Sequence, residues 1–301
     1  MAQLGCRVLP KPDDPVEVPH IMRALEPEVF DAVYAAVSPL LPAPPDGHPL
    51  GCHRRRVPDR TCLWAMLVRL TTGCSWVDAE RLCGGVSDTT LRARRDEWVA
   101  ARVFDILVET MLAIYDEVVG LDLAETCVDG SLHKAPCGGE GTGKSPVDRG
   151  KLGWKWSVAT DADGIPLAWV SEAANRNDCV LLPATLEAVR QRGLLDAITT
   201  LHLDRGYDNG VVRAHVAAAG IAQLVVPPVR PRVSTRTRQP AVRVPLGRRW
   251  PVERTNSWLS NYGQLRRNTD RRQCHRDAQL AFVVAILLIV KLLDRATTGS
   301  D

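Results

Sequence analysis

The chain has 301 residues, of which 45% are hydrophobic and 24% charged. These proportions exclude a disordered or fibrous protein and are typical of a globular chain with a sizeable core. The net charge is only +3, but residues 230–276 hold thirteen arginines and two acids, a local charge of +11. This asymmetry favours one face that binds a polyanion; a solvated arginine-rich surface is the alternative.

The nine cysteines form no Cys-x-x-Cys pair. Their odd number and irregular spacing argue against a disulfide framework or a zinc site, so we expect reduced thiols in a cytoplasmic protein. Proline and acidic residues near the start predict that no signal peptide is present. The apolar run Leu280–Val290 is shorter than the ~20 residues that span a bilayer, and it predicts a buried helix and no membrane contact.

The first part of the chain predicts an arm followed by a helical domain. Residues 1–58 are expected to hold a loose arm, one helix over 21–38 and a proline-rich linker. Apolar residues at helical spacing then predict a small all-helical domain over 59–120, with Asp59 or Thr61 as the cap of its first helix.

One helix of this domain is strongly basic. A cap at Ser87 starts a helix that is predicted to run to Ala101 and to carry Arg92, Arg94 and Arg95. These arginines could belong to a recognition helix of the helix-turn-helix type. A basic surface used for packing or for dimer contact is the equal alternative.

From residue 121 the pattern changes to strands alternating with helices. A strand is predicted over 124–128, and a hairpin over 154–170 turns at Asp161-Ala162-Asp163-Gly164. The later predicted elements are a helix from Asp178 to Arg192, a strand over 198–203, a helix over 209–219, a strand over 221–226, and helices over 252–264 and 277–293. This order predicts an α/β domain over 121–296, a mixed sheet flanked by helices, as in the ribonuclease-H-like fold.

Three carboxylates in this second domain suggest a catalytic site. Asp129 and Asp204 each end a predicted strand, where open α/β sheets place their ligand sites, and Glu253 starts a predicted helix in the basic stretch. Carboxylate oxygens suit magnesium, and two ions ~4 Å apart can promote displacement at a phosphodiester. A single Asp before Gly is more often a turn residue, so the hypothesis depends on the three together.

Four segments of the chain resemble bacterial insertion-sequence transposases of the DDE class, in particular the insertion-sequence-five (IS-five) family. They are Thr126–Ser131, Lys144–Gly153, Leu203–Asp208 and Val252–Leu259. The resemblance implies a ribonuclease-H-like catalytic domain in which Asp129, Asp204 and Glu253 are the catalytic, metal-binding triad for two Mg²⁺ or Mn²⁺ ions. It also implies cleavage of DNA at mobile-element ends, transfer of the 3′-hydroxyls into target DNA, and a homodimer or larger assembly on DNA in the bacterial nucleoid.

The sequence departs from this family where related enzymes often carry a Lys or Arg that contacts the element end. Ser260 and Asn261 occupy those positions, two helical turns after the glutamate. Contacts to DNA are therefore expected from other basic residues: Arg254, Arg248, Arg249, Arg266, Arg267, Lys151, Lys155, Arg92, Arg94 and Arg95. For Arg254 the alternative is that it neutralises its neighbour.

A glycine-rich segment, Gly138–Ser145, matches the pattern G-x-x-x-x-G-K-[ST] of phosphate-binding loops. Such a loop requires a strand before it and a helix that starts at the Lys-Ser pair. Pro136 interrupts the entry and Pro146 the exit, so the sequence predicts a loop and no nucleotide site.

Two other functions stay open at this point. The chain could be a catalytically silent transposase relic that only binds DNA. It could also be a ribonuclease-H-like nuclease that cuts without strand transfer. All three carboxylates are present, which argues against the relic.

Overall fold

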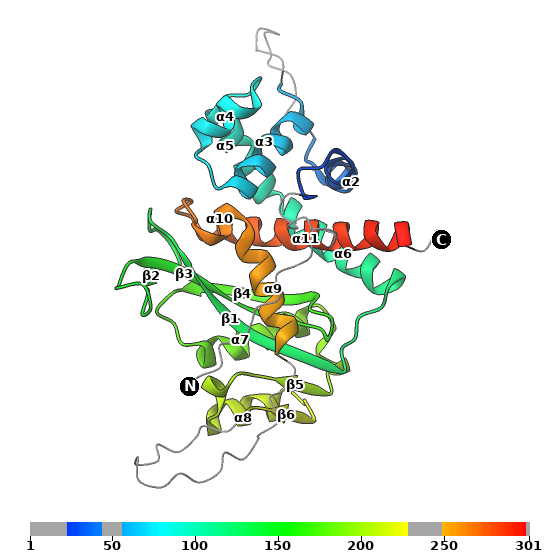
Figure 1. Cartoon of the computed structure of the whole chain (residues 1–301), viewed down its shortest axis with the longest axis vertical. Coiled ribbons are helices and arrows are strands. Elements are labelled where there is room, and N and C mark those ends of the chain that lie inside the picture. Colours follow the sequence, from blue (N-terminus) through cyan, green and yellow to red (C-terminus); the bar gives the residue numbers. More distant parts are fainter. Residues whose placement is uncertain (1–22, 44–55, 228–248, 299–301) are drawn as a thin grey trace, which may run out of the picture.

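The computed structural model describes residues 23–43, 56–227 and 249–298. The predicted arm, most of the predicted linker and Arg248 lie outside these ranges. Figure 1 shows helices from the first part of the chain above a twisted sheet, with the C-terminal helix between the two.

The first part of the chain is helical, as predicted. Its elements are α2 (Pro27–Val37), the short η1 (Ser38–Leu40), α3 (Asp59–Thr72), α4 (Trp76–Cys83), α5 (Asp88–Ala100) and α6 (Val103–Val118). Ser87 caps α5 by accepting a hydrogen bond from the amide of Thr90, as the sequence predicted. The predicted cap of α3 was wrong: Pro58 is the capping residue, and Asp59 lies in the first turn, where it pairs with Arg94.

The second part forms one mixed sheet. Its strands are β1 (Glu125–Lys134), β2 (Gly143–Lys144), β3 (Leu152–Thr160), β4 (Pro166–Ala173), β5 (Thr200–His202) and β6 (Gln223–Val225). They follow the order β2-β3-β1-β5-β6, and β4, which is off this path, also pairs with β3. Strands β2, β3, β4 and β1 pair antiparallel, whereas β1, β5 and β6 pair parallel. The predicted ribonuclease-H-like fold class, with its antiparallel beginning and parallel later strands, is confirmed.

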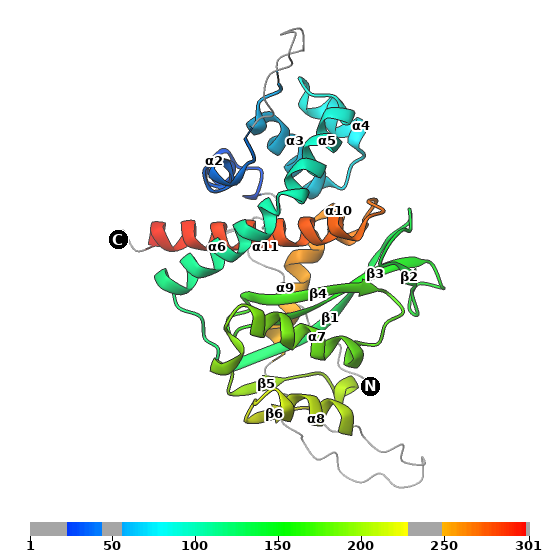
Figure 2. The ribbon, with the colours of Figure 1, turned by 180° about the vertical axis from the view of Figure 1, so that it is seen from behind.

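Helices cover this sheet. They include α7 (Asp178–Gln191), α8 (Gly210–Ala218), α9 (Trp250–Asn261), α10 (Gly263–Arg266) and α11 (Gln273–Thr298), with single turns η2 (Leu195–Ala197) and η3 (Arg205–Tyr207). In Figure 2, seen from behind, α7 lies in front of the sheet and α9 on its far side. The predicted cap of α7 was displaced by one residue: Asn177 accepts the hydrogen bond from the amide of Cys179, and Asp178 starts the helix.

Strand β1 is longer than the sequence predicted. Its parallel pairing with β5 ends at Cys127, but its antiparallel pairing with β3 continues to Lys134. Asp129 therefore does not end a strand; it lies within β1, two residues beyond the parallel pairing. The prediction missed this extension because Gly130 and Ser131 read as a turn, whereas β3 supplies an edge along which the chain continues.

The turn between β3 and β4 is the predicted hairpin turn, and it is docked against α9. Asp161 is fully buried and accepts hydrogen bonds from the amides of Asp163 and Ile165 at 3.0 and 2.7 Å. Gly164 has a positive φ of 77°, and a Cβ there would lie 2.9 Å from the carbonyl oxygen of Pro251. Glycine is required because the turn approaches the helix backbone so closely.

The helix predicted over 252–264 is two helices. Tyr262 has an extended backbone, with ψ at 122°, and separates α9 from α10. The chain turns here because Gly263 packs on the backbone of the α3–α4 turn: a Cβ on Gly263 would lie 2.4 Å from the amide nitrogen of Gly73. This close approach packs the first helices, α2 to α6 (the helical part), against the part of the chain that holds the sheet and α7 to α11 (the catalytic part).

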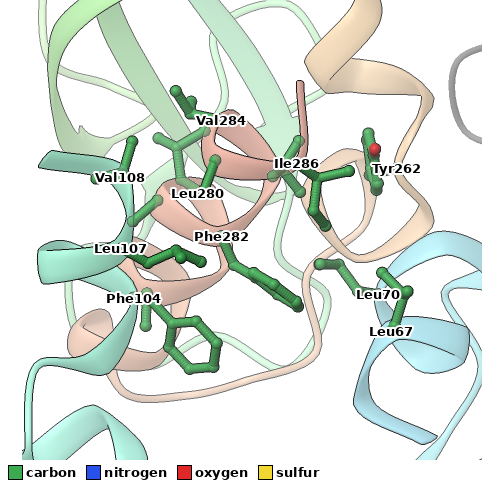
Figure 3. Packing of buried hydrophobic residues seen from close by; sticks show 14 of the residues in the cluster. Leu67, Leu70, Phe104, Leu107, Val108, Tyr262, Leu280, Phe282, Val284 and Ile286 are labelled. Atoms are coloured by element: carbon green, nitrogen blue, oxygen red, sulfur yellow. The ribbon is translucent and has the colours of Figure 1, made fainter. Parts of the chain in front are cut away.

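The main hydrophobic core runs through both parts of the chain. Figure 3 shows Phe104, Leu107 and Val108 of α6 beside side chains of α11, and Leu67 and Leu70 of α3 nearby. The apolar run Leu280–Val290 is buried in this core, as predicted. Among the described helices, α11 included, none has the length and apolar character needed to cross a membrane. The domain boundary placed at residue 120 stays a prediction.

Candidate catalytic site

Three separate elements carry the three carboxylates, and Arg249 links two of them. Asp129 lies in β1, Asp204 follows β5 at the start of η3, and Glu253 lies in the first turn of α9. The guanidinium of Arg249 contacts Asp204 at 3.0 Å and Glu253 at 2.9 Å. Burial raises the pKa of Asp129, and the positive charge of Arg249 opposes this rise. One guanidinium therefore joins Asp204 and Glu253, and its charge also acts on Asp129.

Asn256, one helical turn after Glu253, links α9 to the strand that carries Asp129. Its side-chain nitrogen lies 3.5 Å from Oδ2 of Asp129, and its side-chain oxygen accepts a hydrogen bond from the indole of Trp156 at 2.8 Å. Trp156 is fully buried, so this hydrogen bond ties the Asn256 side-chain amide to the core. These contacts fix the side of α9 that faces β1.

Asp129 has an unusual electrostatic environment. Burial raises its pKa to about 6, and the charges of Asp178 and Asp204 add to that effect. The amide of Gly130 and the charge of Arg249 oppose the rise but do not cancel it. A carboxylate whose negative charge is poorly compensated in this way is stabilised by any further cation beside it.

A fourth carboxylate, Asp178, borders the site. It lies at the first turn of α7, and a Cβ on Gly130 would be only 2.1 Å from its Oδ1 atom. The ammonium of Lys155 contacts the same oxygen at 2.5 Å and donates to the carbonyl of Arg176 at 3.1 Å. Sequence reasoning assigned Asp178 only a capping role, because an acid at a helix start is expected there in any case.

The buried hydroxyl of Tyr207 also lies close to this site. Tyr207 is 2% exposed, and its hydroxyl has no hydrogen-bond partner among the residues that the structure describes. Burial raises its pKa, and the negative charges of Asp178, Asp129 and Asp204 raise it further. A neutral hydroxyl donor thus lies among three carboxylates.

Two of the basic residues expected to bind DNA are buried in internal ion pairs. Lys155 is 3% exposed and pairs with Asp178, and Arg94 is 4% exposed and pairs with Asp59 and Glu97. We therefore leave Lys155 and Arg94 out of the proposed DNA surface.

Other candidates are accessible. Arg92, Lys151, Arg266 and Arg267 are exposed, whereas Arg95 is half-buried between Asp96 and Asp270.

Arg254 is held between two tryptophans. Its guanidinium lies 4.2 Å from the ring centre of Trp250 and 4.6 Å from that of Trp258, and it donates to the carbonyl of Asp163. These contacts join α9 to the β3–β4 turn. The structure supplies a local role for Arg254, and a phosphate contact stays a prediction.

The glycine-rich segment has a different structure from a phosphate-binding loop. Gly138, Gly139 and Gly141 have positive φ angles, Lys144 ends the short strand β2, and residues 146–150 form a turn. In this described stretch no helix begins at Lys144, so the amides that would hold a phosphate are not arranged for it.

The donor set of the site fits a hard divalent cation. Within the described ranges, no three His, Cys, Asp or Glu side chains lie close enough together to hold one ion. The guanidinium of Arg249 contacts both Asp204 and Glu253. Magnesium prefers oxygen ligands such as these carboxylates. One of them is Asp129, whose pKa is raised by burial.

The fold and the site together define the class of this protein. A mixed sheet whose parallel strands lead to two aspartates, with a glutamate brought to them by a later helix, is the arrangement of a ribonuclease-H-like DDE domain. Residues 122–289 match the family described as "Transposase DDE domain", and residues 29–108 match "Putative transposase of IS4/5 family". The first match covers more than half of the chain, and the chain belongs to the DDE transposase family, in its IS4/IS5 branch.

Two relatives come from Burkholderia cepacia. The chain is 35% identical over 137 residues to "Putative transposase for insertion sequence element IS402", a match that covers 44% of this chain and 60% of the relative. It is 33% identical over 123 residues to "Insertion element IS402 uncharacterized 16.2 kDa protein", which covers 40% of this chain and 82% of that relative. The chain thus spans less than two thirds of the first relative.

Proposed function

We propose that this protein is a DNA transposase that cleaves the ends of a mobile element and transfers the resulting 3′-hydroxyls into target DNA. The observation that carries the proposal is that Arg249 pairs with both Asp204 and Glu253 while Asn256 of the same helix contacts Asp129, in a chain of the DDE transposase family. A relic that only binds DNA would have no need to keep the half-buried, poorly compensated carboxylate of Asp129, which costs stability.

Asp129, Asp204 and Glu253 would hold two Mg²⁺ or Mn²⁺ ions, which supply an activated nucleophile and charge stabilisation at the leaving oxygen. The protein residues position these ligands. Asn256 holds Asp129 against α9, and Arg249 neutralises Asp204 and Glu253. When phosphodiester oxygens enter the site, the Arg249 guanidinium can exchange its carboxylate partners for the incoming phosphate, since both are bidentate anions.

The proposal is tested with purified protein, labelled DNA from the ends of its own element, and magnesium or manganese. Wild-type protein should cleave and join these ends, whereas Glu253→Gln, which keeps size but removes charge, should lower both rates more than ~100-fold. Glu187→Gln, an exposed carboxylate on α7, is the matched control and should leave both rates unchanged. Cleavage that survives Glu253→Gln would contradict the assigned site.

The products separate the remaining alternatives. A nuclease of the same fold would give cut ends but no joined product, and a relic would bind DNA and give neither. Assembly as a homodimer or larger complex on DNA, and the nucleoid location, stay predictions that sedimentation of the DNA complex and imaging in the bacterial cell can address.

A further inference from the structure

A second charged surface lies away from the carboxylates, in a groove between the helical part and the catalytic part. The α3–α4 turn, α5, the α10–α11 turn and the loop after β1 form its walls. In Figure 1 the helices α3, α4 and α5 lie above α10, beside the tip of the β1–β3 hairpin. We call this surface the basic groove, and it is lined chiefly by Arg69, Arg92, Arg95, Arg267, Arg271 and Arg272.

The floor of the basic groove is rigid. Asp270 is 6% exposed and contacts Arg69 at 3.2 Å and Arg95 at 2.8 Å. Both guanidiniums also lie over the ring of Trp76, with Arg69 4.0 Å from its centre. One buried carboxylate and one aromatic ring therefore hold two arginines in fixed positions between the two parts of the protein.

The rim of the groove is exposed and positively charged. Arg267, Arg271 and Arg272 are exposed and form no ion pair with any carboxylate in residues 23–43, 56–227 or 249–298. Arg92 on the opposite wall is exposed as well and pairs with Asp88 at 3.1 Å. Arginines kept in water without partners and converging on one groove are typical of a surface for a polyanion.

The glycine-rich loop braces this rim. The amide of Glu140 donates to the carbonyl of Arg271 at 2.8 Å, and the Glu140 carboxylate accepts from the amide of Gln273 at 3.1 Å. Gly139 has a φ of 111°, and a Cβ there would lie 2.0 Å from the carbonyl oxygen of Arg271. The segment that resembled a phosphate-binding loop thus fixes the backbone of the arginines instead.

Strand β1 connects the groove to the carboxylate site and sets the distance between them. Lys134, at the end of β1, lies five residues along the strand from Asp129. Its backbone forms a β-bridge with that of Arg267. At ~3.3 Å per residue this separation is about 17 Å. A DNA strand advances ~3.4 Å per nucleotide, so the same length corresponds to about five base pairs.

We propose that the basic groove binds the phosphate backbone of the element-end duplex about five base pairs from the bond that is cleaved. The inference builds on the proposed function and adds the path of the DNA across the protein. The groove offers separate, exposed guanidiniums, each of which can contact one phosphate. It also joins the helical part to the chemistry, since the same duplex contacts both walls.

The test compares two triple variants with equal loss of charge. In the groove variant Arg267, Arg271 and Arg272 become Ala; in the control Arg190, Arg213 and Arg295, exposed on α7, α8 and the end of α11, become Ala. Binding to element-end DNA is measured by fluorescence anisotropy across a salt series. The groove variant should bind at least tenfold more weakly, and the slope of log affinity against log salt should fall by roughly two to three. The control should match the wild type.

Two further readouts separate this proposal from the proposed function. Phosphate-ethylation interference should locate the lost contacts about five base pairs from the cleavage site, and cleavage of the same DNA by the wild type is measured in parallel. Binding without cleavage by the wild type would defeat the transposase proposal and leave the groove standing. A groove variant that melts normally and keeps the wild-type salt slope would overturn the groove, as would a wild type that binds no duplex.

Discussion

The buried Asp270 and the half-buried Asp129 both lie near arginines, and they differ in how well their negative charge is compensated. At Asp270 burial opposes ionisation, but Arg69, Arg95 and a hydrogen bond from Gln279 outweigh it and hold the pKa below its ordinary value. At Asp129 burial dominates, and the pKa rises to about 6. Asp270 is stabilised by internal ion pairs, whereas Asp129 would be stabilised further by an added cation such as a metal ion.

The contrast shows which property distinguishes a candidate site from an internal ion pair. Both carboxylates lie near the arginine-rich C-terminal region, so the count of neighbouring charges does not separate them. What separates them is direct contact: Asp270 touches two guanidiniums at 3.2 and 2.8 Å, whereas Asp129 has an amide contact at 3.5 Å. Four substitutions can break or sharpen this comparison.

The largest expected effect is on folding, from Asp270→Asn. This change leaves Arg69 and Arg95 buried with one partner fewer, and breaking such a pair costs about 3–5 kcal/mol. The melting temperature should fall by roughly 10 °C. Asp96→Asn is the matched control, because Asp96 contacts the same Arg95 at 2.9 Å but is 48% exposed; thermal melts should show a change below about 1 kcal/mol. Equal effects would remove the distinction drawn for Asp270.

Asp178→Asn should act on chemistry more than on folding. Asp178 borders Gly130 and pairs with Lys155, so its loss should loosen the surroundings of Asp129 and lower cleavage by about 10- to 100-fold. Metal affinity, measured by calorimetry on the DNA-free protein, should fall in the same proportion. A variant with normal metal binding and reduced cleavage would show that Asp178 acts on DNA and not on the ligands.

Asp129→Asn should stabilise the protein in metal-free buffer, and only above a certain pH. The folded-state pKa, about 6, exceeds the reference value of 3.8, so the ionised form destabilises the fold. This cost is full above pH 6 and disappears as the pH falls towards 4. The variant should gain about 1 kcal/mol at pH 8 and nothing at pH 4, after allowance for solvent screening. A gain of equal size at both values would contradict the raised pKa.

The smallest expected effect is from Arg254→Ala. Loss of the stacking on Trp250 and Trp258 should cost about 1 kcal/mol in urea unfolding. If Arg254 serves only to join α9 to the β3–β4 turn, the salt dependence of DNA binding should not change. A decrease of the salt slope by about one would instead assign it a phosphate contact.

The sequence was sufficient to predict the fold class and the order of elements. Periodicity, capping serines and the Asp-Gly turn specify local structure, and these predicted α5, the β3–β4 hairpin and the buried α11. Two details depended on contacts between distant segments: strand β1 continues because β3 offers it an edge, and α9 ends because Gly263 meets Gly73. The one-residue shift of the α7 cap from Asp178 to Asn177 is local, since both side chains can cap a helix.

The candidate site could be predicted only in part. The positions of Asp129, Asp204 and Glu253 follow from the pattern of strand ends and the family resemblance, but Arg249 as the residue that links them does not. The inward position of Arg94 and Lys155 could not be predicted, because the sequence does not reveal which basic side chain finds a buried partner. Asp270, 201 residues from Arg69, could be recognised as the common partner of Arg69 and Arg95 only once the chain was folded.

The shared core also has a consequence for the order in which the protein can fold during synthesis. Phe104 and Leu107 of α6 are packed by α11, which begins at Gln273, so the first helices leave the ribosome long before their partner. At roughly 5–20 residues per second, the 155 residues between Val118 and Gln273 represent about 10–30 s of waiting. During that interval the apolar face of α6 is exposed. The helical part is therefore completed last although it is made first, and a chain that stops before α11 leaves it without its core.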